Sequence, residues 1–247
     1  MKNMEYKNKI FRNAFYWYTD TIKEYVNESY DGELFTFLRP RQLRDISDLL
    51  SKHFKFDTIK CIETGASCDA GADGAVGLYF AKLCELTNGE FYSVDINKPS
   101  LDLSKKLYKK HNLEVNHNLK DSVEYLENID FIPNLVHLDA MDFNLKNPLP
   151  SALHGWREFA ALKDKKPIGS IIIVDDNWID GTWIEWVYPE ATGLDNEIID
   201  ITYPILGKGS LISHFINDEE TSSKSGWEMI GVYTPGHNNK LIMKKIK

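Results

Sequence analysis

The chain has 247 residues, of which 43% are hydrophobic and 27% are charged, so it can bury a core and is not a disordered chain. Its formal net charge of −8 disfavours a broad contact with nucleic-acid phosphates. The three cysteines, Cys61, Cys68 and Cys84, form no Cys-x-x-Cys pair, and no apolar run approaches the roughly 20 residues of a membrane span. The first ten residues are polar and charged and predict no secretory signal. We therefore expect a cytoplasmic protein that contacts neither nucleic acid nor membrane.

Residues 1–56 predict an N-terminal helical extension. Aromatic and aliphatic side chains recur there at helical spacing, and we expect their shared face to pack as core rather than to bind a cofactor. The run Arg39-Pro40-Arg41 is expected to interrupt the helical pattern, because proline lacks the backbone N–H that a helix interior uses.

Residues 57–247 alternate short apolar segments with amphipathic ones. Strands are expected at 58–63, 90–95, 112–118, 134–138 and 170–174, and helices at 78–86, 100–111, 121–128 and 151–162. This alternation predicts an α/β fold with a doubly wound, Rossmann-like, mostly parallel sheet. Two last strands, 226–233 and 240–246, flank a turn-rich segment and predict an antiparallel hairpin at the end of the sheet. Residues 178–206 are aromatic and acidic, and we expect them to form an insertion or lid near the site.

The ends of the first two strands of this sheet carry a candidate cofactor site. Ligands bind in open α/β sheets at the carboxyl ends of the strands, where Glu63 and Asp95 stand. A carboxylate at Asp95 can accept hydrogen bonds from both hydroxyls of a ribose. The first loop lacks the Gly-x-Gly-x-x-Gly pattern of dinucleotide sites, and Asp73 would face the phosphates there. These residues favour a cationic nucleoside without phosphates.

The same residues resemble class I S-adenosylmethionine-dependent methyltransferases. The run Ile62-Glu63-Thr64-Gly65-Ala66-Ser67 is similar to the family's acid-x-Gly motif, Tyr92-Ser93-Val94-Asp95 to its ribose motif, and Lys120-Asp121-Ser122 to its adenine motif. The resemblance implies S-adenosylmethionine as the cofactor, held by Glu63, Gly65, Ser67, Gly74, Asp95, Asp121 and Ser122. The first loop is longer than the usual motif, so the glycine that adjoins the methionine part stays open between Gly65, Gly71 and Gly74.

Acidic residues also end the fourth and fifth strands. Asp139 and Asp142 follow the fourth, and Asp175-Asp176-Asn177 ends the fifth. Carboxylates on neighbouring strand tips repel one another, and a divalent cation with oxygen ligands removes that conflict. The pattern resembles metal-dependent O-methyltransferases of the catechol and macrolide-sugar types. The resemblance implies that Asp139, Asp176 and Asn177 hold Mg²⁺, with Asp175 as a further participant, and that the metal acidifies the hydroxyl of a small-molecule acceptor.

The proton acceptor is less clearly marked. Where those families carry Lys or His, this chain has Asp142, which we expect to act as the base, with His137 in reserve; His154 and His237 are expected to be surface or structural residues. Three alternatives stay open: a methyltransferase without metal, a Rossmann-type oxidoreductase, and a non-catalytic binding module. The sequence does not decide whether the chain forms a homo-oligomer.

Overall fold

The computed structural model describes residues 2–26, 32–68, 75–144, 147–178, 206–217, 225–232 and 239–247. The helices and strands follow one another in this order: α1 (Lys2–Val26), α2 (Gly32–His53), β1 (Lys60–Thr64), α3 (Val76–Leu86), β2 (Glu90–Asp95), α4 (Lys98–Lys110), β3 (Asn116–Leu119), α5 (Ser122–Asn128), β4 (Leu135–Leu138), α6 (Leu149–Leu162), β5 (Ile171–Trp178), β6 (Leu206–Gly207), α8 (Ser210–Asn217), β7 (Trp227–Val232) and β8 (Asn239–Lys245). Two of these elements, β6 and α8, were not expected from the sequence.

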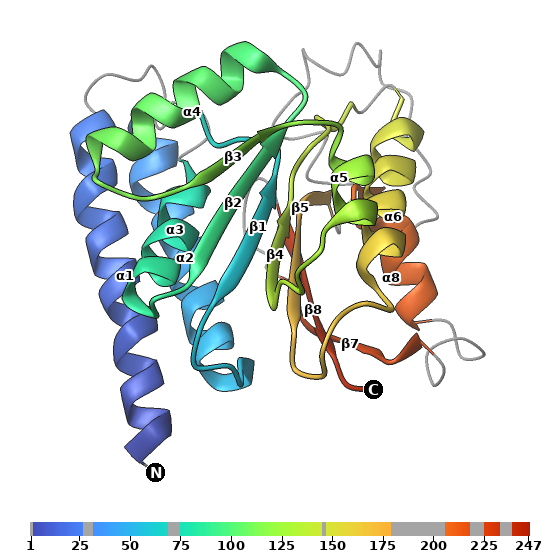
Figure 1. The fold of residues 1–247 in the computed structure, drawn as a ribbon, viewed down its shortest axis with the longest axis horizontal. Helices are drawn as coiled ribbons and strands as arrows, with labels where there is room; N and C mark the ends of the chain where they lie inside the picture. Colours follow the sequence, from blue (N-terminus) through green and yellow to red (C-terminus); the bar gives the residue numbers. More distant parts are fainter. Residues whose placement is uncertain are drawn as a thin grey trace.

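The strands form one mixed sheet with the order β3-β2-β1-β4-β5-β8-β7, and β6 pairs with the C-terminal end of β5. Strands β1 to β5 run parallel to one another, whereas β6 runs antiparallel to β5, and β8 runs antiparallel to both β5 and β7. The predicted doubly wound sheet with a terminal antiparallel hairpin is therefore confirmed (Figure 1). The chain switches direction across the sheet between β1 and β4, which is where ligands bind in such folds.

Helices cover both faces of the sheet (Figure 1). One face packs against α1 to α4, and the other packs against α5, α6 and α8. Successive side chains of a strand point to opposite faces, so Leu135 and Ile171 join the first core while Val136 and Ile172 join the second. The continuous apolar runs of β4 and β5 follow from this burial on both faces.

The N-terminal helices extend the first of these cores. Phe11 and Tyr18 of α1 and Leu43 and Ile46 of α2 are buried in one cluster with residues of α3. The expected core packing of the aromatic face is thus confirmed. The expected interruption at Pro40 is wrong, because α2 continues through this residue. Tertiary burial of an apolar helix face outweighs the local cost that proline imposes.

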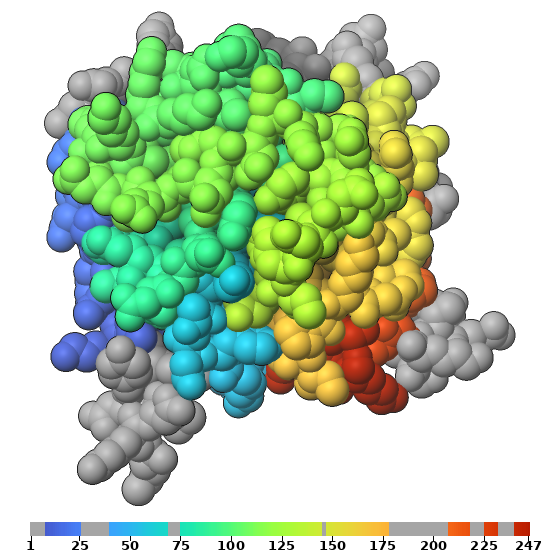
Figure 2. Space-filling model, in the orientation of Figure 1, coloured from blue at the N-terminus to red at the C-terminus, as the bar shows by residue number. Residues whose placement is uncertain are grey.

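Figure 2 shows which segments of the chain lie next to one another on one face of the molecule. The segment around residues 95–130, drawn in green, lies beside the segment around 150–170, drawn in yellow to orange. Within the described ranges, none of the helices is both long enough and apolar enough to cross a membrane.

Candidate cofactor and acceptor site

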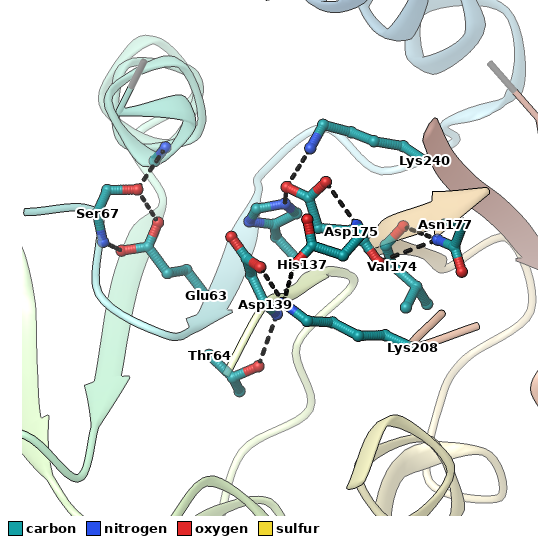
Figure 3. Close-up of polar contacts among 12 residues, drawn as sticks. Glu63, Thr64, Ser67, His137, Asp139, Val174, Asp175, Asn177, Lys208 and Lys240 are labelled. Atoms are coloured by element: carbon teal, nitrogen blue, oxygen red, sulfur yellow. Dashed lines mark hydrogen bonds and ion pairs between the residues drawn. The ribbon is translucent and has the colours of Figure 1, made fainter. Parts of the chain in front are cut away.

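Two polar networks lie side by side at the carboxyl ends of the parallel strands (Figure 3). The first joins Glu63 at the end of β1 to the loop that follows it. The second joins the ends of β4 and β5 to two lysines from later parts of the chain. Of the predicted site residues, Gly74 lies outside the described ranges, as do His237 and residues 179–205 of the predicted insertion.

Glu63 is fully buried and organises the first loop. Its Oε1 accepts hydrogen bonds from the Ser67 amide at 3.1 Å, the Ser93 hydroxyl at 2.9 Å and the Tyr108 hydroxyl at 3.2 Å. Its Oε2 accepts from the Ser67 hydroxyl at 2.9 Å, and that hydroxyl oxygen accepts from the Gly77 amide at 3.0 Å. The buried carboxylate is therefore compensated by donors from the loop after β1, from β2 and from α4, and Ser67 links it to the first turn of α3.

Gly65 allows the first loop to turn tightly against β4. Its φ of +80° lies in the left-handed region, and its amide donates to the Val94 carbonyl at 2.9 Å. A Cβ at this position would collide with the backbone carbonyl of Asp139. A glycine is thus required here by both the backbone angle and the close approach.

Asp95 joins the ends of β1 and β2. Its Oδ2 accepts from the Ala66 amide at 2.9 Å, and its Oδ1 accepts from the Asn97 amide at 2.6 Å. A carboxylate offers about four lone-pair positions, so two bonds leave capacity for hydroxyl donors. The next residue, Ile96, is 73% exposed, although it is a large apolar side chain. Ile96 was not among the predicted site residues; in the sequence it is an isoleucine directly after the acid that ends a predicted strand.

The predicted adenine-contact pair is tied to two helices. Asp121 is the N-cap of α5 and accepts from the Glu124 amide at 3.0 Å. The buried Ser122 hydroxyl lies 2.9 Å from Nε2 of His154 on α6, which is also 3.6 Å from Oε1 of the buried Glu158. His154 therefore links the start of α5 to α6, and it is not an isolated surface residue.

Lysines neutralise the acids at the ends of β4 and β5. The Lys208 ammonium group donates to Oδ1 of Asp139 and lies 2.8 Å from Oδ2 of Asp176. The fully buried Lys240 of β8 donates to Oδ2 of Asp175. Three carboxylates and two ammonium groups thus leave a formal charge of −1 among these five residues, in place of the −3 expected from the acids alone.

His137 belongs to the same cluster. It is 2% exposed, its Nε2 lies 3.3 Å from Oδ2 of Asp175, and its ring packs against Phe80 with centroids 5.2 Å apart. Figure 3 shows the imidazole between the carboxylates of Asp139 and Asp175. His137, the predicted reserve base, therefore lies beside Asp139 and Asp175 at the ends of β4 and β5.

Asn177 holds the backbone at the end of β5. Its amide nitrogen donates to the carbonyls of Val174 at 2.8 Å and Asp175 at 3.0 Å, and its amide oxygen accepts from the Gly209 amide at 2.7 Å. These bonds stabilise an irregularity between Val174 and Asn177, where the register with β8 shifts. Asp176 sits in this bulge at a φ of +51°, a conformation that costs a non-glycine residue roughly 1 kcal/mol or more.

The implied magnesium ligands do not fit a metal as they lie. Asp139 and Asp176 share the ammonium group of Lys208, and the oxygen of Asn177 is committed to the backbone. Another trio, His137, Asp139 and Asp175, has ligand atoms within 4.8 Å of one another. A lysine is bound to each of its two carboxylates, so a divalent cation there would face two ammonium groups. The conflict between the acids that motivated a metal is relieved by lysine instead.

The cluster shifts the ionisation of its members. Burial raises the pKa of Asp139 to about 7, and the charges of Asp175 and Asp176 add to this rise while Lys208 opposes it. Burial lowers the pKa of Lys208, but the neighbouring carboxylates outweigh it and hold that pKa above its usual value. About a third of the Asp139 side chain, 35%, is exposed, so it is the most accessible acid of this cluster. Asp142 is exposed on the turn after β4, and it takes part in none of the ion pairs among the described residues.

Sequence reasoning missed both lysines. Lys208 follows β6, and Lys240 lies in β8, so each is far along the chain from the acid that it neutralises. The available signal for Lys240 was a lysine directly before the apolar run Leu241-Ile242-Met243 of a predicted strand. Nothing in the sequence near Lys208 distinguishes it from a surface lysine.

No family model and no curated protein matches this sequence. A candidate methyltransferase from Streptococcus mutans, solved in complex with SAH, is 10% identical, with a TM-score of 0.52 over 83% of this chain and 98% of that chain. An rRNA methylase from Streptococcus thermophilus is 13% identical, with a TM-score of 0.50 over 84% and 98% of the two chains. A candidate rRNA methylase from Clostridium thermocellum is 16% identical, with a TM-score of 0.50 over 83% and 96%. At these identities the likeness establishes the fold alone.

Proposed function

We propose that this chain is an S-adenosylmethionine-dependent methyltransferase. The single observation that carries the proposal is the arrangement at the ends of β1 and β2, where Glu63 orders the first loop and Asp95 presents a partly exposed carboxylate beside Ile96. A ribose can donate its hydroxyls to Asp95, and the flat adenine base can cover Ile96. Its fold, which it shares with the candidate methyltransferase crystallised with SAH, supports the same reading.

The environment of α3 disfavours a dinucleotide at this site. In dinucleotide-binding folds, the pyrophosphate binds to the amide groups at the N-terminus of the helix after the first strand. Here the Gly77 amide in the first turn of α3 donates to the Ser67 hydroxyl, which donates in turn to the buried carboxylate of Glu63. A negative charge already occupies this end of the helix, so a second anion would be repelled. A ligand that carries an ammonium group and no phosphate suits it better.

The two polar networks would have different roles in methyl transfer. Bound S-adenosylmethionine would supply an electrophilic methyl group on a sulfonium centre. Glu63 and Ser67 would shape the loop around its amino-acid part, and Asp95 would fix its ribose. The turn after β4 adjoins this loop at Gly65, so an acceptor there would lie next to the methyl donor. Asp139 and Asp142 are the carboxylates of that turn that can take up the acceptor proton.

We infer a small-molecule hydroxyl as the acceptor, with ribosomal RNA as the second candidate. The net charge of −8 supports a small molecule, because RNA binding depends on basic surfaces. Two observations favour RNA: two structures of similar fold are named as rRNA methylases, and α4 carries a local excess of lysines over acids. Those lysines are partly neutralised, since Lys98 and Lys105 pair with Asp102 and Lys110 pairs with Glu24.

Calorimetry with SAH and with NAD tests the cofactor. We expect SAH to bind, NAD not to bind, and Asp95→Ala to weaken SAH by at least about tenfold, because one charge-assisted hydrogen bond contributes roughly 1.5–3 kcal/mol. Asp102→Ala is the matched control, since it removes an ion-paired surface carboxylate of the adjacent helix. Binding of NAD in place of SAH would refute the proposal, and unchanged SAH affinity in Asp95→Ala would remove that residue from the site.

Transfer of a labelled methyl group separates the two acceptors. Incubation of the protein with labelled S-adenosylmethionine and either a panel of hydroxyl-bearing small molecules or purified rRNA should label the small-molecule fraction. Labelling of rRNA alone would overturn the inference on the acceptor and leave the cofactor assignment intact.

A further inference from the structure

Lys208 places a permanent positive charge between the ends of β4 and β5. Its side chain is 3% exposed, and it pairs with Asp139 and Asp176, the two acids that a divalent metal would need. We propose that the ammonium group of Lys208 is the resident cation of this site and excludes a divalent metal from it. Lys208 is then a positioning residue that keeps the two carboxylates together without an exchangeable ion.

The backbone around Lys208 is built to hold it there. Gly207 pairs with Asn177 in the short contact of β6 with β5, and the Lys208 amide donates to the Asp176 carbonyl at 3.3 Å. A Cβ at Gly207, whose φ is +109°, would collide with that same carbonyl oxygen. Gly209 donates to the side chain of Asn177. The residues before and after Lys208 are therefore both fastened to the bulge that carries Asp176.

The geometry explains why a metal would not bind beside the lysine. Mg²⁺ binds oxygen ligands at about 2.0–2.1 Å and requires nearly octahedral geometry. An ion held by Asp139 and Asp176 would lie within a few ångströms of an ammonium group that is already bonded to both and is itself buried, and the two positive charges would repel each other. Lys240 forms an ion pair with the neighbouring carboxylate of Asp175 and disfavours a metal there for the same reason. The two lysines together cover all three acids of the cluster.

One consequence concerns the reaction and rests on the proposed function. Lys208 provides the positive charge that a metal would otherwise bring next to the acceptor. Methyl transfer should then proceed in the presence of a chelator, with the acceptor oriented by the protein's own charges.

Binding of Mn²⁺, measured by electron paramagnetic resonance titration, tests the proposal without any assay of activity. We expect the wild-type protein to show no saturable site. Lys208→Ala should show one saturable Mn²⁺ site that Mg²⁺ competes for, because it uncovers two adjacent carboxylates. Adding Asp176→Asn to this variant should abolish the acquired site.

Two controls fix the cause. Lys208→Arg keeps the positive charge and should stay without a site, and Lys98→Ala removes the cation of a surface pair with Asp102 and should also stay without one. If Lys208→Ala does not fold, Lys208→Gln removes the charge, keeps a similar side-chain length and carries the same expectation. A saturable Mn²⁺ site in wild type that Asp139→Asn removes would overturn the proposal, as would the absence of a site in both folded charge-removal variants.

The binding of SAH, measured in parallel with and without a chelator, keeps this result distinct from the cofactor assignment. If SAH binding were lost when the chelator is added, a bound metal would be required, which would contradict the role of Lys208 as the resident cation. Absence of SAH binding under both conditions would refute the proposed function and leave the metal measurement valid.

Discussion

Glu63→Gln should lower the stability of the protein more than it lowers its affinity for the cofactor. The side chain is fully buried and is covered by Ser67, Ser93 and Tyr108, so it has no surface to offer a ligand. A glutamine keeps the shape and removes the charge. It also places an NH₂ group next to donors, so that the Ser67 hydroxyl loses its acceptor while still receiving the Gly77 amide.

The size of the effect follows from these contacts. A hydrogen bond to a charged acceptor contributes roughly 1 kcal/mol more than a bond to a neutral one, and four such bonds end on this carboxylate. A neutral amide costs less to desolvate than a carboxylate, which offsets part of this difference and leaves a loss of about 2 kcal/mol in the free energy of unfolding. For a chain of this length, this corresponds to a fall in Tm of about 4–8 °C.

Thermal melting and SAH calorimetry on the same samples make the measurement. Glu90→Gln is the matched control, because Glu90 lies at the other end of β2 in an exposed pair with Lys60 and should leave Tm unchanged within about 1–2 °C. A Glu63→Gln variant that melts like wild type but binds SAH more than tenfold more weakly would contradict this expectation, since Glu63 would then contact the cofactor directly.

Three further substitutions test other parts of the site and of the core. Ile96→Ser should weaken the affinity for SAH by about fivefold in calorimetry with no change in Tm, because the adenine would bury only part of the isoleucine side chain. An unchanged affinity would place the adenine elsewhere. Asp121→Ala should lower the free energy of unfolding by about 1 kcal/mol in urea, since it removes the N-cap of α5. Burial lowers the pKa of Lys166 well below 10.5, so the unfolded chain takes up this proton more readily and the folded state loses stability as pH falls. Lys166→Met removes this proton uptake together with the 2.7 Å bond from Lys166 to the Pro133 carbonyl, so its Tm relative to wild type should be more favourable at pH 7 than near pH 10; a pH series of melting curves with the opposite trend would contradict this.

The fold and the position of the proposed cofactor site follow from local sequence. Strands such as β4 and β5 are short, apolar and bounded by turn residues, and their alternation with amphipathic helices leaves few arrangements other than a parallel sheet. Glu63 and Asp95 end adjacent strands, so their closeness is a consequence of the topology. The interruption expected at Pro40 failed because a local preference was outweighed by the burial of the helix face.

The proposed acceptor site, at the ends of β4 and β5, depends on contacts that the sequence does not specify. Parallel neighbouring strands bring Asp139 and Asp176 together, and this much was predictable. Which cation neutralises them is decided by the turn after β6 and by the position of β8 in the sheet. Neither the short pairing of Gly207 with Asn177 nor the antiparallel register that places Lys240 beside Asp175 leaves a periodic pattern in the chain.

A group of acids at strand ends therefore indicates only that a positive charge is needed. A metal and a lysine both provide it, but with different consequences. A metal can leave, can bind two substrate oxygens and can acidify a hydroxyl. A lysine fixed by its backbone stays in place and keeps its charge, because its neighbouring carboxylates raise its pKa. In this chain Lys208 touches Asp139, and the backbone of Asp139 touches the turn at Gly65 that borders the cofactor loop. The lysine thereby connects the two halves of the site through packed contacts rather than through an ion.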